Sequence, residues 1–256
     1  MSPLFFYEEG SGPPIVFLHG FCETHEIWKG FVKPLSTQFR VILLDLPGFG
    51  KSEILIAPFT IDDVGRAVAK WLVENQVLKS ILIGHSLGGY VTLSVAEHHP
   101  QLLEGMGLVH SISFGDTSEK KENRNKVIEF VRKNGVQPFI DTFVPGLFFD
   151  KLSPAIPHIH EIASQTKSDT LIGYASAMRD RPDRSSVLAK SKIPKLLIAG
   201  SEDTLIPVEA SRKMAQMSQN SSFFELTNTA HMGFFEAEME CQMIIRRFAE
   251  RIFFNN

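Results

Sequence analysis

The chain is poor in cysteine, in net charge and in long apolar runs, and each shortage excludes a class of protein. Only two of its 256 residues are cysteines, Cys22 and Cys241, so the fold does not depend on a disulfide framework. The formal net charge of -3 gives no basic surplus for binding nucleic acid. No run approaches the ~20 apolar residues of a membrane span, and the first residues lack the basic segment of a secretory signal. We therefore expect a cytoplasmic protein with a small-molecule substrate, no nucleic-acid partner and no membrane span.

Apolar residues make up 43% of the chain, enough for a sizeable core. Short apolar runs alternate with longer amphipathic ones, a pattern typical of an α/β fold whose mostly parallel, doubly wound sheet is covered by helices on both faces. The runs expected as strands are 15–18, 41–44, 81–83, 105–109, 195–199 and 222–226. Helical periodicity covers 61–74, 86–97, 209–216 and 236–253.

The strand pattern stops between about residues 113 and 191. This segment contains helical stretches at 122–133 and 158–165, interrupted by several prolines. We expect a core domain formed by residues 1–112 and 192–256, with residues 113–191 inserted as a helical lid (cap). An ordinary helical excursion on the surface is the alternative.

The strongest motif is Gly84-His-Ser86-Leu-Gly88, which lies between an apolar strand and an amphipathic helix. A Gly-x-Ser-x-Gly sequence at such a strand-to-helix turn forms a nucleophile elbow. The sharp turn strains the serine backbone and tolerates only small neighbours, while lifting the serine oxygen clear of the sheet. A glycine-rich turn without chemistry is the alternative, but the strand and helix on either side favour Ser86 as a nucleophile.

A nucleophilic serine needs a base, and the base needs an orienting acid. Among nine histidines, His231 follows the last expected strand and enters the final helix, at the sheet edge where ligands bind. Asp203 follows the preceding strand, which gives the order Ser, Asp, His. Glu202 is the nearest rival to Asp203, and an isolated aspartate here could simply cap a turn.

The remaining site residues follow from the chemistry of acyl transfer, in which backbone amides hold the oxyanion. Leu87, directly after the nucleophile, and Phe21, after the first buried strand, are the expected donors. We expect Phe143, Phe148 and Ile206 to line the substrate pocket. The phenylalanines could instead form a core within the insertion.

Four blocks in this order resemble the α/β-hydrolase superfamily along nearly the whole chain. They are His19-Gly20-Phe21, the run from Asp45 to Ser52, the run from Gly84 to Gly89, and Gly200-Ser-Glu-Asp203 with Ala230-His231. The resemblance is to small lidded serine esterases and lactonases, and it implies an eight-stranded, mostly parallel sheet, no cofactor, and Ser86, Asp203 and His231 as the triad. Ala230 departs from the glycine that many relatives have before the histidine. The run from Arg179 to Arg184 is similar to 3-oxoadipate enol-lactonases.

Two other patterns do not predict sites. The run from Gly48 to Ser52 resembles part of a phosphate-binding loop, but Asp45 stands where that motif needs glycine, and its carboxylate would repel phosphate. His158 and His160, like the pair His98 and His99, lack further ligands for a metal. We expect no metal.

The sequence thus predicts a carboxylesterase-like serine hydrolase that cleaves an ester, thioester or lactone of a small molecule through an acyl-enzyme. Carbon–carbon bond hydrolysis or perhydrolysis on the same triad remains open, and so does a signalling protein that keeps a hydrolase pocket. The oligomeric state is not predicted.

Overall fold

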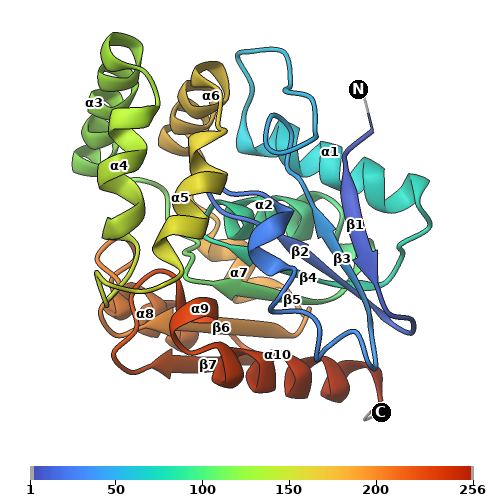
Figure 1. Ribbon diagram of the computed structural model, residues 1–256. Coiled ribbons are helices and arrows are strands. Elements are labelled where there is room, and N and C mark those ends of the chain that lie inside the picture. The colour runs from blue at the N-terminus through green and yellow to red at the C-terminus, as the bar shows by residue number, and fades with distance from the viewer. Residues whose placement is uncertain (1–2, 255–256) are drawn as a thin grey trace.

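The computed structural model describes residues 3–254, and a sheet runs through the middle of the molecule (Figure 1). Within this range the sheet has seven strands in the order β1-β3-β2-β4-β5-β6-β7. All neighbouring strands pair in parallel except β1, which pairs antiparallel with β3. The strands are β1 (Phe6–Glu9), β2 (Pro14–Leu18), β3 (Arg40–Leu44), β4 (Ser80–His85), β5 (Leu103–Val109), β6 (Lys195–Gly200) and β7 (Ser221–Leu226).

The resemblance implies eight strands, and this number is wrong for the described residues. The sheet ends at β1, because residues 3–5 form no strand outside it. The terminal residues 1–2 and 255–256 of the predicted core domain lie outside the described range. The predicted fold class, a mostly parallel sheet of the α/β-hydrolase type, is confirmed.

Helices cover both faces of the sheet, as the alternating pattern predicts. One face carries α1 (Ile61–Glu74), α2 (Leu87–His98), α7 (Ser185–Lys190) and α8 (Val208–Met217), which pack side by side in this order. The other face carries α10 (Glu238–Phe253), which packs on β5 and β6, and the segment around the short helix η1 (His25–Trp28) (Figure 1). A further short helix, η2 (Pro100–Leu102), leads into β5.

Local sequence explains where these elements begin and end. The strands β2, β3 and β6 are almost wholly buried, because helices cover both of their faces. Helix α1 begins at a capping box in which Thr60 and Asp63 satisfy each other's backbone amides. The expected helix 236–253 is instead two helices, α9 (Gly233–Glu236) and α10, because Ala237 leaves helical geometry at φ -133° and ψ 48°.

The predicted insertion at residues 113–191 contains five helices. They are α3 (Ser118–Asn134), α4 (Gln137–Gly146), α5 (Ile156–Ser164), α6 (Ser168–Arg179) and α7. Helices α3 to α6 stand together beyond one end of the sheet, where α3 packs on α6 and α4 packs on α5 (Figure 1). Helix α7 packs on α2 and α8 instead. The role of this insertion as a lid stays a prediction.

Among residues 3–254, no helix combines the length and the apolar character needed to cross a bilayer.

Candidate active site

Ser86 lies at the turn between β4 and α2, in the strained backbone that the motif predicts. Its φ of 48° and ψ of -111° are unusual for a residue with a side chain. Glycine is required on both sides: a Cβ on Gly84 would lie 2.3 Å from Gly88 C, and one on Gly88 would lie 2.6 Å from Leu18 O. Ser111 fixes the turn, because its hydroxyl donates a hydrogen bond to Ser86 O at 2.7 Å.

The structure brings His231 and Asp203 together, although 28 residues separate them. Asp203 follows β6, His231 lies in the loop between β7 and α9, and His231 Nδ1 donates to Asp203 Oδ2 at 2.7 Å. The other carboxylate oxygen accepts from the amides of Leu205 and Ile206, each at 2.9 Å. The Nδ1–H tautomer leaves Nε2 of His231 free to accept a proton.

Charge determines the protonation of this pair. Burial alone would raise the pKa of Asp203, but the positive charge of His231 and hydrogen bonds from two histidines hold it well below its usual range. Burial alone would lower the pKa of His231, and the charge and hydrogen bond of Asp203 outweigh burial and raise it. Asp203 is therefore ionised at neutral pH and increases the affinity of His231 for a proton.

Ser86 and His231 line the same cavity, which has a volume of about 320 Å³. Three other predicted residues also line it: Phe21, Phe143 and Ile206. Leu87 is the first residue of α2, directly beside Ser86. Phe148 does not line the cavity, which corrects the pocket assigned from the sequence. Its side chain is fully buried and its ring packs 6.4 Å from that of Phe235, so Phe148 contributes to the core beneath α9.

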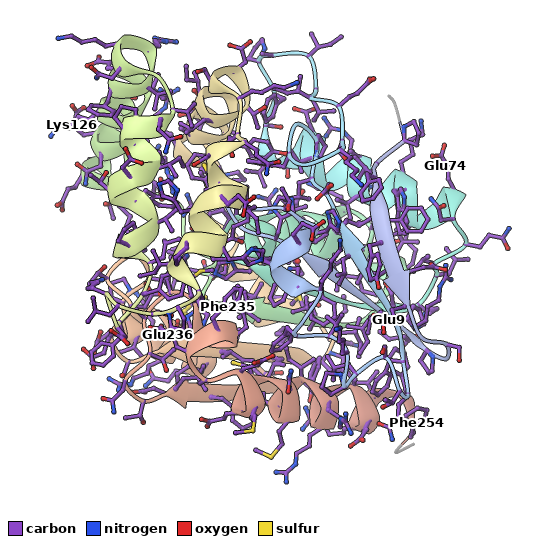
Figure 2. The ribbon with its side chains drawn as sticks, in the orientation of Figure 1. Glu9, Glu74, Lys126, Phe235, Glu236 and Phe254 are labelled. Atoms are coloured by element: carbon purple, nitrogen blue, oxygen red, sulfur yellow. The ribbon has the colours of Figure 1, made fainter. Side chains whose placement is uncertain are left out.

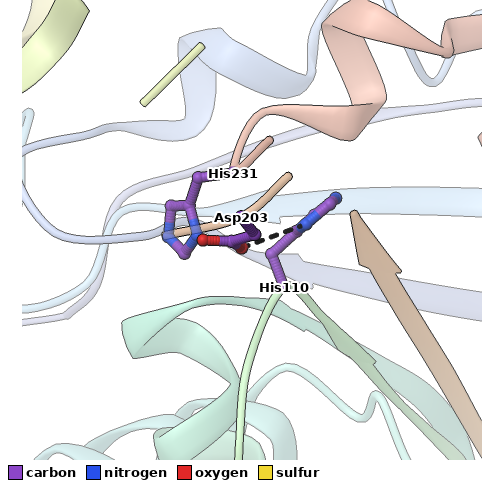
Figure 3. A group of neighbouring side chains, drawn as sticks. All are labelled: His110, Asp203 and His231. Atoms are coloured by element: carbon purple, nitrogen blue, oxygen red, sulfur yellow. Dashed lines mark hydrogen bonds and ion pairs between the residues drawn. The ribbon is translucent and has the colours of Figure 1, made fainter. Parts of the chain in front are cut away.

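His110, a histidine that the sequence patterns do not single out, lies on the far side of Asp203 from His231 (Figure 3). Gly233 N donates to His110 Nε2 at 3.2 Å, so the ring proton is on Nδ1, which faces Asp203 Oδ2 at 3.5 Å. Burial lowers the pKa of His110 to about 4, and the ring is therefore neutral at pH 7. His110 follows β5 directly, and this position at a strand end was the available signal.

His110, Asp203 and His231 also meet a geometric condition for a metal site, because one ligand atom from each lies within 4.8 Å of the others. The atoms that face one another are already used, because Nδ1 of each histidine carries its proton toward Asp203 Oδ2. Asp203 Oδ2 accepts from His231, and His110 Nε2 accepts from Gly233. A metal would displace these hydrogen bonds, so the donor set fits a hydrogen-bonded acid better than a metal centre.

Glu23 and His85 form a second buried pair beside the cavity, which the sequence analysis also missed. Glu23 Oε2 lies 2.9 Å from His85 Nδ1 and accepts from Gly20 N at 2.6 Å. His85 Nε2 lies 3.0 Å from the carbonyl oxygen of His231. Both ring nitrogens of His85 thus face oxygen atoms, and the charge and hydrogen bond of His85 hold the pKa of Glu23 below its usual range although burial alone would raise it. The pair connects three loops: those of Gly20, Ser86 and His231.

The loop of the base is also attached to the insertion. His231 N donates to Leu147 O at 2.9 Å. Glu236 accepts from Phe149 N at 2.6 Å through one oxygen and from Ala230 N at 2.8 Å through the other. Figure 2 shows Glu236 at the base of the helical insertion.

The block from Asp45 to Ser52 does not form a phosphate site. The carboxylate of Asp45 is fully buried inside it and accepts from His25 N at 2.8 Å and from Lys51 N at 2.9 Å. The amide of Lys51, which a phosphate in this block would need, therefore binds a side chain of the protein itself.

A family model described as alpha/beta hydrolase fold matches residues 13–238. The chain belongs to this family. It is 27% identical to 3-oxoadipate enol-lactonase 1 of Acinetobacter baylyi over 94% of this chain and 90% of that protein. A thermophilic esterase from Thermogutta terrifontis, solved with malate bound, superposes with a TM-score of 0.92 at 28% identity, over 98% of this chain and 94% of that one.

A third relative is longer. The dihydrolipoyllysine-residue acetyltransferase component of the acetoin cleaving system of Pseudomonas putida is 30% identical over 79% of this chain. The match spans 55% of that protein, so the chain corresponds to about half of its length.

Proposed function

We propose that this protein is a serine hydrolase that cleaves a carboxylic ester, thioester or lactone of a small molecule through an acyl-enzyme. The observation that carries the proposal is the shared cavity. Ser86, at a strained elbow, and His231, hydrogen-bonded to an ionised Asp203, both face it. The similarity to an enol-lactonase and an esterase supports the same chemistry.

In the proposed reaction, Ser86 Oγ attacks the carbonyl carbon while His231 Nε2 takes its proton. The backbone amides of Leu87 and Phe21 hold the oxyanion, and Asp203 stabilises the imidazolium. The imidazolium then protonates the leaving alkoxide or thiolate as the carbonyl re-forms. In the second half, His231 takes a proton from water, whose oxygen attacks the acyl carbon, and returns it to Ser86 as the acid leaves.

The insertion contributes the roof of this site in our proposal. Helices α3 and α4 supply Val127, Phe139 and Phe143 to the cavity, beside Phe21 from the core. Such a roof would exclude water and select the acyl group, as a lid does.

The test uses a fluorophosphonate probe and p-nitrophenyl esters of increasing chain length on the wild type and on Ser86→Ala. Ser168→Ala, an exposed serine at the start of α6, is the matched control. We expect labelling and turnover in the wild type and the control, and neither in Ser86→Ala. Labelling without ester turnover would favour carbon–carbon bond hydrolysis or a signalling role, and a folded wild type that is never labelled would overturn the proposal.

A further inference from the structure

One helix of the insertion turns a polar face to the cavity. Lys120, Asn123, Arg124 and Val127 line the cavity at positions i, i+3, i+4 and i+7 of α3, which share one side of a helix. Three of these four side chains are hydrogen-bond donors, and two are cations. Another part of the lining is apolar: the rings of Phe139 and Phe143 stack at 4.9 Å, and the Phe21 ring lies 6.0 Å from that of Phe143.

One carboxylate lines the cavity on this polar side, that of Asp116, and both of its oxygens already accept hydrogen bonds from arginines. Asp116 Oδ1 accepts from Arg181 Nη1 and Oδ2 accepts from Arg124 Nε, both at 2.7 Å. Arg181 also donates hydrogen bonds to Met178 O and Phe114 O, and its guanidinium lies over the face of the Tyr90 ring. Lys120, Arg124 and Arg181 carry three positive charges here, and Asp116 and the Asp183 carboxylate near Arg181 carry two negative charges, which leaves an excess of one positive charge at this end.

Donors remain available after these bonds are counted. Arg124 is held through Nε, and its two terminal nitrogens have no partner among residues 3–254. The Asn123 side chain likewise has no hydrogen bond within the described part of the chain. Lys120 Nζ makes one bond, to Leu205 O at 3.2 Å, and has two further protons to donate. Asp116 fixes Arg124 in position, so these donors are arranged before a ligand arrives.

We propose that this face of α3 binds a free carboxylate, so that the substrate is an ester whose acyl chain ends in a second, ionised carboxyl group. This proposal rests on the proposed ester hydrolysis at Ser86. The polar face of α3 would bind the charged end of the substrate. The phenylalanine rings would pack against its methylene chain, and Ser86 would attack its ester carbonyl. A planar carboxylate matches the fork of Arg124 nitrogens, and the excess positive charge favours an anion over a neutral group.

The experiment compares two esters that differ only at the far end. Monomethyl glutarate carries the carboxylate, and methyl 5-amino-5-oxopentanoate carries an uncharged amide of the same shape. We measure kcat/KM for both with the wild type, Arg124→Gln and Lys120→Gln. Lys126→Gln is the control, because Lys126 lies on the outer side of the same helix and does not line the cavity (Figure 2).

In the wild type and in Lys126→Gln, we expect the carboxylate ester to be preferred by about tenfold or more, less so at high salt. Each cavity variant lowers this preference by about tenfold, mainly through KM for the carboxylate ester. Any effect of the substitutions on the groups around Ser86 cancels in the ratio of the two esters.

A wild type that hydrolyses both esters equally would overturn the carboxylate subsite and leave the hydrolase proposal intact. If neither ester is turned over, calorimetry of monomethyl glutarate with Ser86→Ala decides, because binding that is lost in Arg124→Gln supports the subsite without any catalysis. Inorganic phosphate competing more strongly than glutarate would assign the cations to a phosphate group and refute the carboxylate.

Discussion

The buried pair of Glu23 and His85 gives a prediction that separates shape from charge. Glu23→Gln can place its amide oxygen where Oε2 lies, so that it still accepts from both Gly20 N and His85 Nδ1 but carries no charge. Glu23→Ala removes this acceptor and leaves the buried His85 ring and the buried Gly20 amide unpaired. We therefore expect the alanine variant to be far more damaging than the glutamine variant.

The magnitude follows from burial, since Glu23 is 2% exposed and His85 is fully buried. Breaking such a pair by removing one partner costs about 3–5 kcal/mol, whereas a neutral replacement that keeps the hydrogen bonds costs about 1–2 kcal/mol. At about 2–4 °C per kcal/mol for a domain of this size, Glu23→Ala lowers Tm by about 6–20 °C. It also frees the loop of Gly20 and Phe21, with a loss in kcat of about 10² from a displaced oxyanion donor.

The assay is thermal unfolding followed by circular dichroism, together with ester turnover, at pH 7. Burial alone would raise the pKa of Glu23, but the charge and hydrogen bond of His85 and the amide of Gly20 lower it. Its contribution is therefore complete above about pH 4.3 and is lost only as pH falls through the lower folded value. Glu74→Ala, an exposed glutamate that pairs with Lys70, is the control and changes stability by at most about 1 kcal/mol. Equal losses in Glu23→Ala and Glu23→Gln would refute the idea that the hydrogen bonds of Glu23 stabilise the site independently of its charge.

Three further substitutions test other parts of the site. Asp203→Asn should lower kcat by about 10⁴ and shift the acidic limb of the kcat/KM profile to lower pH, because Asp203 raises the pKa of His231; an unmoved limb would contradict this. His110→Asn should flatten the loss of stability between pH 7 and pH 4, measured by urea unfolding. In the unfolded chain His110 takes up a proton near pH 6.5, and in the folded protein only near pH 4. This difference destabilises the folded protein by about 3 kcal/mol at pH 4. If the stability of His110→Asn falls with pH as steeply as that of the wild type, His110 does not cause the loss. Gly84→Ala should fail to fold or lose more than about 2 kcal/mol, whereas Gly146→Ala, with open space around its Cβ position, should fold normally in the same denaturation assay.

Sequence patterns predicted the elements whose identity is set locally or by complete burial. The strands β2, β3 and β6 are continuous apolar runs, and α1 carries its start signal in Thr60 and Asp63. Strand β1 was missed because two of its four residues are glutamates and it is only half buried at the sheet edge. Its pairing with β3 makes it a strand.

Proline explains the helix missed between the two expected in the insertion. The spacing of Pro138 and Pro145 predicts breaks, but Pro138 lies in the first turn of α4, where its fixed φ and missing amide fit the helix. Pro145 lies inside α4, one residue before its end, so neither proline interrupts the helix.

The sequence likewise predicted some residues of the candidate site and not others. The expected positions of Ser86, Asp203 and His231 followed from one rule, that each ends a strand or follows one at the same edge of the sheet. Glu23 and His85 lie 62 residues apart, and only the folded chain shows that their side chains meet. The misplaced Phe148 has the same cause, because periodicity does not tell whether a ring faces the cavity or the core.

The bonds of Glu236 and Leu147 bear on how this protein can change its specificity. The stretch from Leu147 to Phe149 belongs to the insertion, yet it shares hydrogen bonds with the loop that carries His231. Replacing residues 113–191 as one module would therefore detach the loop of the base. Exchanging side chains on the inner faces of α3 and α4 leaves those bonds intact. New substrate preferences are thus accessible by point substitutions on two helices, whereas transplanting a whole insertion must carry the partners of Glu236 and His231 with it.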